Sequence, residues 1–412
     1  MNKIRISSIV GVCLLGAMVW ITGCQEPVKE IAERASVDLN TAMSGDTTGY
    51  ERARLGTELV FPADYGPHPA FKTEWWYFTG NLDTESGRQF GYELTIFRSA
   101  LAPETPGNLG DAEGQSKWSS NQLYMGHFSL ADLGGGQASG GQDASGGQDA
   151  SSGQRAGSER SEPQFYSFER FSRGALDLAG SQASPFRVWL EDWTMEGSPD
   201  DLFPLRLRAQ EGDIALDLTL SSLKPIVLQG DKGFDRKGAD EGNASHYYSF
   251  TRLETSGTIG IGGDLMPVSG TSWKDHEWST SALDENQAGW DWFSLQLSDN
   301  REIMFYVLRE KDGGSGQFTN GMLVESDGSY SPLSRDDVSI RVLDSWKSPH
   351  SGATYPSGWE MSIPAYEIEL TITPLMKDQE LNATIRYWEG AVSIKSNTDV
   401  TGRGYVELTG YK

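Results

Sequence analysis

Short runs of alternating apolar and polar residues cover most of this chain, and turns rich in Gly, Asp and Asn separate them. The clearest runs are 271–278, 289–297 and 303–309, which follow one another across brief polar breaks. A period of two with short turns is typical of antiparallel strands joined in a meander. Similar runs occur on both sides and long helical periods are scarce, so the sequence predicts an all-β protein.

Residues two apart in a strand share a face. His276 and Trp278 should therefore point to one side of their strand, with the neighbouring carboxylates on the other. We expect the first side to face one cavity together with alternate aromatic residues of the next two strands, namely Trp290, Trp292 and Tyr306. Wide ring surfaces with few polar groups suit an apolar or unsaturated ligand.

An earlier stretch of the chain repeats this arrangement. Residues 74–98 align with 289–309, so that Trp75 falls on Trp290 and both stretches close on an Arg. Self-similarity of this kind indicates a duplicated hairpin, and therefore two related β domains. It adds Trp75 and Tyr77 to the residues expected to bind the ligand.

The first residues have the pattern of an export signal. Lys3 and Arg5 precede an apolar run, 9–21, that is short for a membrane span. A basic start followed by a short apolar segment is the composition of a secretory signal. We therefore expect residues 1–23 to be removed from the mature protein.

The signal ends in Ile21-Thr22-Gly23-Cys24, which resembles a bacterial lipobox. The resemblance implies that Cys24 becomes the lipidated first residue of the mature chain. Gln25 follows in place of an Asp, which implies the outer membrane and a periplasmic protein. A plain signal peptide with an incidental Cys is the alternative. The only other cysteine is Cys13, so neither a disulfide nor thiol catalysis is expected.

Changes in composition divide the remaining chain. Residues 24–58 are polar and are interpreted as a tether. Strand-like runs then suggest a first β domain over 59–265 and a second over 266–412, each with strands spaced to close into a barrel. The segment 134–160 repeats Gly-Gly-Gln-Asp-Ala-Ser and has no large apolar residue, so we expect a disordered insertion. A cluster of Gly and charges at 230–238 is interpreted as a crossover or a lid.

The composition also limits the classes of function. The chain has 412 residues, which suits two domains, and a formal net charge of −24. Such a charge repels nucleic acid and anionic lipid headgroups, so neither is an expected partner. The five His residues are scattered, and the chain has no phosphate-binding loop and no nucleophile elbow. We therefore expect no metal and no cofactor.

Several motifs together resemble the AttH/CrtC family, over roughly residues 59–412. They lie at 72–77, 187–193, 228–233, 275–278, 289–292 and 404–411. The resemblance implies two tandem lipocalin-like antiparallel β-barrels. The family includes carotenoid 1,2-hydratases and many exported proteins encoded near ABC-transporter genes, which implies an ABC transporter as a partner.

In the hydratases a His-x-Trp pair and a Tyr-x-Asp pair are thought to form the active site. His276 and Trp278 match the first pair, and Tyr306 matches the Tyr of the second. Leu308 stands where the acid would be, and Asp291 is considered as a substitute acid although it lies on the opposite strand face. Hydration of an alkene needs a proton donor, so the missing acid bears directly on that activity.

Three hypotheses follow from these residues. The favoured one is a lipid-anchored periplasmic protein that binds or carries an apolar ligand such as a lipid or isoprenoid. The second is a hydro-lyase that uses His276, Trp278 and Tyr306 on an isoprenoid double bond. The third is a structural or assembly lipoprotein with filled barrels. A cavity that reaches His276 would favour the first two hypotheses, and an acid on the same face would favour the second.

Overall fold

The computed structural model describes residues 46–103, 120–135, 162–199, 201–281, 283–284 and 286–412. The expected signal peptide, Cys24 and nearly all of the low-complexity segment lie outside these residues. Within the described ranges, none of the helices has the length and apolar character needed to cross a membrane. The helical elements described there are two 3-10 turns, η1 (Ala63–Tyr65) and η2 (Pro364–Tyr366).

The first sheet has thirteen antiparallel strands, and its main path runs β4-β3-β2-β1-β13-β12-β9-β8-β7-β6-β5. Two short strands, β10 and β11, pair with β12 beside this path. The strands are β1 (Thr73–Asp83), β2 (Arg88–Ala100), β3 (Gln122–Gly135), β4 (Gln164–Arg173), β5 (Ala179–Ala183), β6 (Phe186–Leu190), β7 (Trp193–Glu196), β8 (Leu205–Glu211), β9 (Ile214–Ser222), β10 (Val227–Leu228), β11 (Phe234–Arg236), β12 (Ala244–Ile261) and β13 (Asp264–Ser281).

The second sheet has ten strands in the order β17-β16-β15-β14-β25-β24-β22-β21-β18, with β23 paired to β24. A separate hairpin is made by β19 (Ser345–Lys347) and β20 (Thr354–Pro356). The strands of the sheet are β14 (Gln287–Leu297), β15 (Glu302–Glu310), β16 (Asn320–Val324), β17 (Tyr330–Ser334), β18 (Ser339–Val342), β21 (Trp359–Ile363), β22 (Ile368–Pro374), β23 (Glu380–Leu381), β24 (Tyr387–Ser396) and β25 (Thr401–Thr409).

The strand orders agree with the predicted duplication. The hairpin β1–β2 has the same place in the first sheet as β14–β15 in the second. Its register also matches, because Trp75 faces Phe97 across β1–β2 and Trp290 faces Leu308 across β14–β15. The prediction of an all-β fold with two lipocalin-like antiparallel sheets is therefore confirmed.

The change from one sheet to the other occurs later than the sequence suggested. We expected the second domain to begin at residue 266, but β13 pairs with both β1 and β12 and belongs to the first sheet. The turn at Gly262 and Gly263, both with positive φ, resembles a domain break in the sequence. It is the tip of a long hairpin, and sheet membership changes only after Ser281.

The expected tether also ends earlier than residue 58. Residues 46–58 are described, and they contact the first sheet. The Tyr50 hydroxyl donates to the Ala100 carbonyl at 2.9 Å, and the Glu51 amide donates to the Ala70 carbonyl at 2.9 Å. This part of the chain is therefore attached to the sheet by hydrogen bonds.

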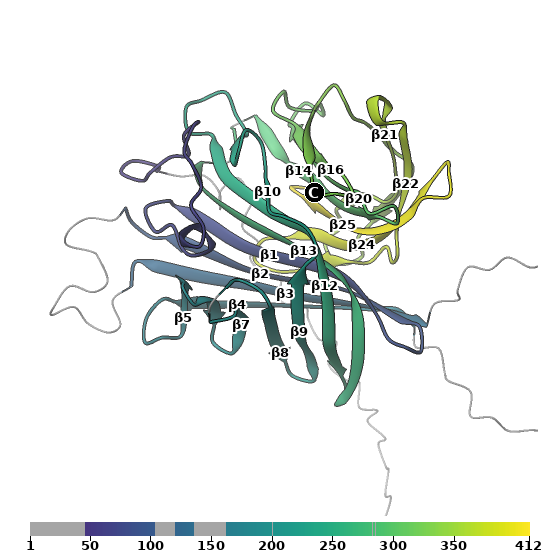
Figure 1. The fold of residues 1–412 in the computed structure, drawn as a ribbon, viewed down its shortest axis with the longest axis horizontal. Helices are drawn as coiled ribbons and strands as arrows, with labels where there is room; N and C mark the ends of the chain where they lie inside the picture. The colour runs from purple at the N-terminus through teal and green to yellow at the C-terminus, as the bar shows by residue number, and fades with distance from the viewer. Residues whose placement is uncertain (1–45, 104–119, 136–161, 200, 282, 285) are drawn as a thin grey trace, which may run out of the picture. The chain divides into compact units, whose positions relative to one another are not determined.

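Each sheet has its own aromatic core, and a third cluster lies between the sheets. Figure 1 shows β1, β2 and β13 running between the second sheet and strands β8 and β9. The inner face of the first sheet buries Trp76 and Trp278, and the second sheet buries Trp359 and Trp388. The third cluster joins Tyr77 of β1 to aromatic residues of β14 and β15. Strand β1 and the part of β13 from Ser272 onward are consequently buried on both faces.

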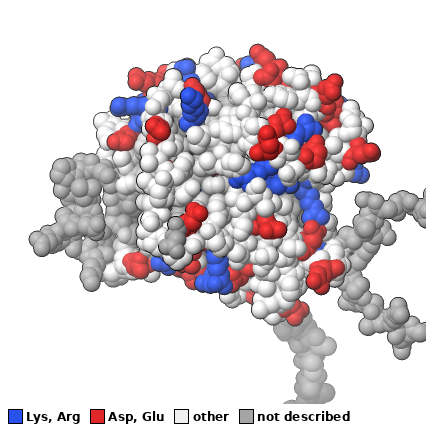
Figure 2. Space-filling view, in the orientation of Figure 1, with Lys and Arg blue, Asp and Glu red and all other residues white. Residues whose placement is uncertain are grey.

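Charged side chains are mixed on the surface. Figure 2 shows acidic and basic groups interspersed over one face of the molecule. Exposed pairs such as Arg206–Asp217 and Arg341–Glu360 hold opposite charges within hydrogen-bonding distance. Such exposed pairs contribute little to stability.

Candidate functional site

A cavity of about 250 Å³ lies between the two sheets. Its walls combine aromatic rings with buried acids and one lysine. The principal lining residues are Trp75, Tyr77, Phe97, His127, Lys237, Tyr247, Asp275, Glu277, Trp290, Trp292, Tyr306, Leu308, Tyr387 and Glu407. We call this cavity the inter-sheet pocket.

The strand register explains how these side chains meet. On the first sheet, Phe97, Trp75, Glu277 and Tyr247 stand next to one another across β2, β1, β13 and β12. Neighbouring strands are about 4.8 Å apart, so paired residues on one face form a continuous row. This row makes the first wall of the pocket.

The second sheet provides the facing wall in the same way. Tyr306, Trp292 and Glu407 are paired across β15, β14 and β25. The Trp292 ring contacts Tyr77 of the first sheet edge-on, with the ring centres 5.3 Å apart. Edge-to-face contacts at this distance are favourable and fix the positions of both rings.

The structure brings together most, but not all, of the residues singled out in the sequence. Trp75, Tyr77, Trp290, Trp292 and Tyr306 all line the inter-sheet pocket. Their positions agree with the predicted ring-lined cavity. Their binding role is a proposal considered below.

His276 and Trp278 lie elsewhere, and the expectation that they share this cavity is wrong. They point into the core of the first sheet, where Trp76 stacks on His276 with ring centres 4.8 Å apart. Alternation along β13 was predicted correctly, but the strand is buried on both faces. The carboxylates of Asp275 and Glu277, and not the His-x-Trp pair, face the pocket.

His276 instead belongs to a hydrogen-bonded chain inside the first sheet. Its Nε2 lies 2.8 Å from Glu74 Oε1, and His68 Nδ1 lies 2.7 Å from the same oxygen. Arg98 Nε donates to the other Glu74 oxygen at 2.8 Å. Burial lowers the pKa of His276 to about 3. Although burial opposes ionisation of Glu74, Arg98 and His68 hold its pKa well below the usual value.

Among the described residues, His68, Glu74 and His276 are also the group that could hold a metal ion, with donor atoms within 4.8 Å of one another. The two imidazoles hydrogen-bond to the same Glu74 oxygen, and the Arg98 guanidinium holds the other oxygen of that carboxylate. A guanidinium so close opposes the binding of a metal cation at the same group. The arrangement therefore fits a charge-balanced hydrogen-bond chain better than a metal centre.

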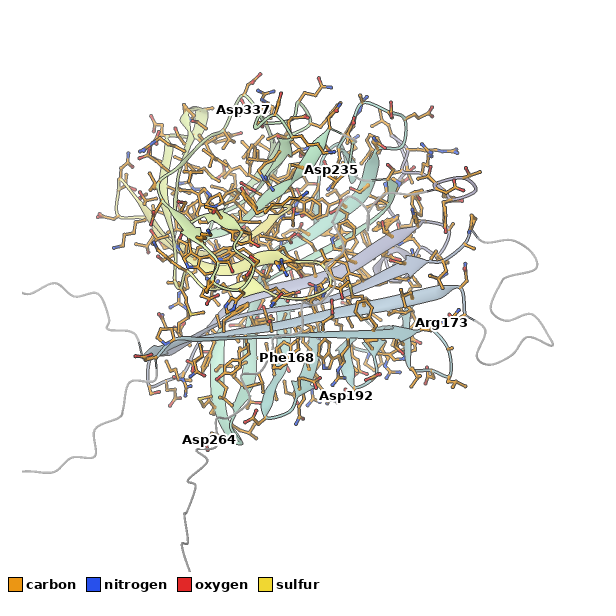
Figure 3. The ribbon with its side chains drawn as sticks, turned by 180° about the vertical axis from the view of Figure 1, so that it is seen from behind. Phe168, Arg173, Asp192, Asp235, Asp264 and Asp337 are labelled. Atoms are coloured by element: carbon orange, nitrogen blue, oxygen red, sulfur yellow. The ribbon has the colours of Figure 1, made fainter. Side chains whose placement is uncertain are left out.

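One important acid was missed in the sequence. The Tyr306 hydroxyl donates to Asp235, with oxygen distances of 2.8 and 2.9 Å. Asp235 comes from β11, in the cluster interpreted as a crossover or lid, and Figure 3 shows it on the same side of the first sheet as the second sheet. Leu308 leaves the acid position of the Tyr-x-Asp pattern empty, and Asp235 supplies a carboxylate to the same Tyr from a distant part of the chain.

Lys237, which lines the pocket, connects Asp235 to the pocket acid Glu277. Its Nζ pairs with Glu277 and lies 3.4 Å from Asp235. It also lies 4.9 Å from the centre of the Tyr306 ring. Burial alone would lower the pKa of Lys237, but Glu277 and Asp235 outweigh it and raise the pKa. The spacing of Asp235 and Lys237, two residues apart at the end of β11, was the signal available in the sequence.

Two further acids in the pocket have pKa values near neutrality. Asp275 accepts hydrogen bonds from Tyr247 and Trp273, each at 2.7 Å, and burial raises its pKa to about 6. Glu407 accepts one from Trp290 Nε1 at 2.8 Å, and burial raises its pKa to about 8. Groups with pKa values close to the ambient pH can both give and take protons.

Asp291, considered above as a substitute acid, lies away from this cluster. Its carboxylate accepts from Arg309 Nε at 2.8 Å and from the Tyr411 hydroxyl at 3.0 Å. These partners hold it at the opposite face of β14 from Trp290 and Trp292, as alternation predicted.

Two lipocalin-like sheets with a ring-lined pocket between them define the class of this protein. The chain belongs to the AttH-like family, whose model matches residues 52–160 and 148–411. The crystal structure of an AttH-type protein, NE1406 from Nitrosomonas europaea, is 33% identical, with a TM-score of 0.71. That match covers 88% of this chain and 100% of the other.

A more distant relative in structure is kievitone hydratase from Nectria haematococca. It is 13% identical, with a TM-score of 0.61, and the match covers 88% of this chain and 96% of the hydratase. At this identity the similarity shows a shared fold. No curated protein sequence matches the chain.

Proposed function

We propose that this protein binds an apolar, unsaturated small molecule in the inter-sheet pocket. The observation that carries the proposal is the meeting of Trp75, Trp290 and Trp292 from two sheets around one cavity of about 250 Å³. Pockets lined by rings with a few placed polar groups are typical of small-molecule sites. The volume suits one or two fused rings or a short isoprenoid.

The position of the cavity modifies the expectation drawn from the lipocalin resemblance. In a simple barrel the ligand lies inside the barrel. Here large side chains, including Trp76 and Trp359, are buried in the interiors of the two sheets. The space for a ligand lies between the sheets, which argues against a purely structural role with all interior space filled.

Binding can be tested by intrinsic Trp fluorescence with farnesol, β-ionone, 1-naphthol and palmitate as probes. We expect saturable quenching by at least one of the first three. Trp290→Leu should weaken that binding about tenfold, because it removes a ring from the wall. Trp189→Leu, on β6 and outside the pocket, is the matched control. Absence of saturable binding by all four probes would contradict the proposal.

A second candidate function is acid–base catalysis of the hydro-lyase type. It is favoured by the Tyr306–Asp235 pair beside Lys237 and Glu277, which places proton donors next to the ring-lined space. Addition of water to a double bond needs a proton for one carbon and water for the other. The fold shared with a protein named a hydratase is consistent with this candidate.

This candidate can be tested by incubating the bound probes with the protein in H₂¹⁸O and measuring water addition by mass spectrometry. We expect Asp235→Asn to lower any addition about 100-fold. Asp231→Asn, an exposed residue nearby, is the control. Equal rates in the wild type and Asp235→Asn would exclude a role for the Tyr306–Asp235 pair in the proton transfer.

The cellular setting remains a proposal from the sequence. We propose that residues 1–23 direct export and that Cys24 carries a lipid, which would place the protein at the outer membrane beside an ABC transporter. The lipobox resemblance supports the lipid, and labelled palmitate should enter the wild type but not Cys24→Ser. Incorporation in both forms would contradict it.

A further inference from the structure

A second set of acid–base groups lies at the other end of the inter-sheet pocket, away from Tyr306. The Tyr387 hydroxyl, from β24, lies 2.7 Å from His127 Nδ1, on β3. His127 Nε2 lies 3.3 Å from Glu169 Oε1, on β4. Tyr387 and His127 both line the pocket. The three side chains form a hydrogen-bonded line that crosses from one sheet to the other.

The exposure of these groups changes along the line. His127 is fully buried, Tyr387 is 4% exposed, and the Glu169 side chain is 11% exposed. Glu169 is held in place by Thr384, whose amide and hydroxyl donate to its two oxygens at 2.8 and 2.9 Å. The line therefore runs from a carboxylate near solvent to a phenol at the ligand.

The charges set the direction of the hydrogen bonds. Burial lowers the pKa of His127, so its ring is neutral near pH 7. Burial opposes ionisation of Glu169, but His127 and Thr384 outweigh it and lower the pKa of Glu169, which is therefore ionised. A neutral ring between an acceptor and a hydroxyl donates from Nε2 to Glu169 and accepts from Tyr387 at Nδ1.

The other groups facing Tyr387 determine how it can act. Burial raises the pKa of its hydroxyl well above the usual value, and Glu93, Glu389 and Glu407 add to the effect. A stable phenolate is therefore unfavourable at this position. Tyr387 can pass a proton on only if it gains another in the same step.

The two acid–base ends of the pocket are well separated. His127 is paired with Thr95, Thr95 with Tyr77, and Tyr77 with Asp275. Three strand spacings place His127 about 14 Å from Asp275. The two sets therefore contact different parts of a ligand.

We propose that Glu169, His127 and Tyr387 form a proton relay, and that Tyr387 takes a proton from an acidic C–H or O–H of the bound ligand. As the ligand's bond to hydrogen breaks, the Tyr387 oxygen gains that proton and its own proton passes to His127 Nδ1. The ligand becomes an enolate or phenolate, and Glu169 stabilises the imidazolium. The inference rests on the proposed ligand binding and adds the chemical class of the ligand, which is an apolar molecule with an enolisable carbonyl or a phenol.

A purely structural role would predict a different result. In that case the three side chains would only join β3 and β4 to β24, and proton exchange on a bound ligand would not depend on them. The test therefore measures proton exchange separately from binding and stability.

The probe is β-tetralone, an apolar bicyclic ketone whose carbonyl-adjacent hydrogens can exchange in D₂O. We expect the wild-type protein to bind it, as measured by Trp quenching, and to accelerate deuterium uptake, as measured by mass spectrometry. Tyr387→Phe and His127→Gln should lower the accelerated rate about 100-fold while the dissociation constant stays within about threefold. Tyr330→Phe, with its exposed ring on β17, is the matched control.

Glu169→Gln is the second variant, for use if Tyr387→Phe loosens the structure, because Gln keeps one acceptor oxygen for Thr384 and removes the charge and the second acceptor oxygen. We expect a reduction of about tenfold or more, with an unchanged melting temperature. Binding of β-tetralone with equal exchange in wild type, Tyr387→Phe and Glu169→Gln would overturn the relay and leave the proposed binding intact. Binding of β-tetralone to the wild type without faster deuterium exchange would also overturn the relay and leave the proposed binding intact. Failure of β-tetralone to bind while farnesol, β-ionone or 1-naphthol binds would overturn the ligand class proposed here and leave the proposed binding intact, whereas failure of every probe would overturn both.

Discussion

Single residues on neighbouring positions of β13 have opposite environments. Asp275 faces the inter-sheet pocket, whereas His276 faces the core of the first sheet and has a pKa of about 3. The difference arises because alternate side chains leave a strand on opposite faces and both faces of β13 are buried. The backbone of β13 therefore separates the Asp275 carboxylate in the pocket from the His276 imidazole in the core.

The raised pKa of Glu407 predicts a pH dependence of stability. Burial raises it to about 8, so the folded state holds this proton at pH values where the unfolded state has released it. Stability should therefore fall as the pH rises from about 4.5 to about 8. Glu407→Gln should reduce this loss, as measured by urea midpoints at pH 5 and pH 9. An identical pH slope in the two proteins would contradict the assignment.

The buried pair between Glu74 and Arg98 should be important for stability. Both side chains are almost fully buried, so Glu74→Gln leaves the Arg98 charge without its partner. We expect a loss of about 3–5 kcal/mol in the free energy of unfolding, measured with urea. Asp217→Asn, which breaks an exposed pair with Arg206, should cost about 1 kcal/mol or less. Similar losses in both variants would show that the Glu74 chain is not a buried ion pair.

At the scale of elements, β1 and β13 position nearly everything in the site. Their pairing places Trp75 beside Glu277 and Tyr77 beside Asp275 on the pocket face. The same pairing places Trp76 beside His276 on the core face. A slip of one residue would exchange the two faces, so the register of these strands is strongly constrained.

Gly270 reveals how closely these strands approach. A Cβ atom there would lie 2.1 Å from the Asn81 carbonyl oxygen of β1. Gly270→Ala should therefore push the strands apart and cost about 1–3 kcal/mol, measured by thermal unfolding. Gly135→Ala, where nothing lies within 4 Å, should be nearly neutral. A neutral Gly270→Ala would mean that the β1–β13 spacing is less constrained than the structure indicates.

At the scale of the whole molecule, polar contacts link the two sheets through buried groups. Tyr77 donates to Glu389, and Asn81 donates to the Gly404 carbonyl at 3.1 Å. Lys224 Nζ, 3% exposed, pairs with Glu302 at 2.7 Å. These groups would lose their partners if one sheet unfolded without the other, which is costly for buried polar atoms.

The two sheets should consequently unfold together. We expect a single urea transition for the described body of the chain, with coincident curves from Trp fluorescence and far-ultraviolet circular dichroism. Lys224→Met should uncouple the sheets and broaden or split the transition, because it leaves Glu302 with one fewer partner. Two separate transitions in the wild type would contradict this expectation.

The all-β class, the duplication and the aromatic character of the site could all be predicted from the amino-acid sequence. Alternation with period two is local, and the repeated hairpin preserves both its rings and its register, so these features can be read along the chain. Trp75, Trp290 and Tyr306 were found for that reason.

Which face of each strand meets the inter-sheet pocket depends on how the two sheets pack, and this was not predictable from the sequence. Alternation distinguishes two faces but does not say what covers each of them, and β13 is buried on both. The tertiary structure also brings together residues that are distant in the sequence. Asp235 hydrogen-bonds to Tyr306, and Glu169 hydrogen-bonds to His127 and Thr384. Such contacts depend on sheet order and on the packing of one sheet against another, which no local pattern of residues records.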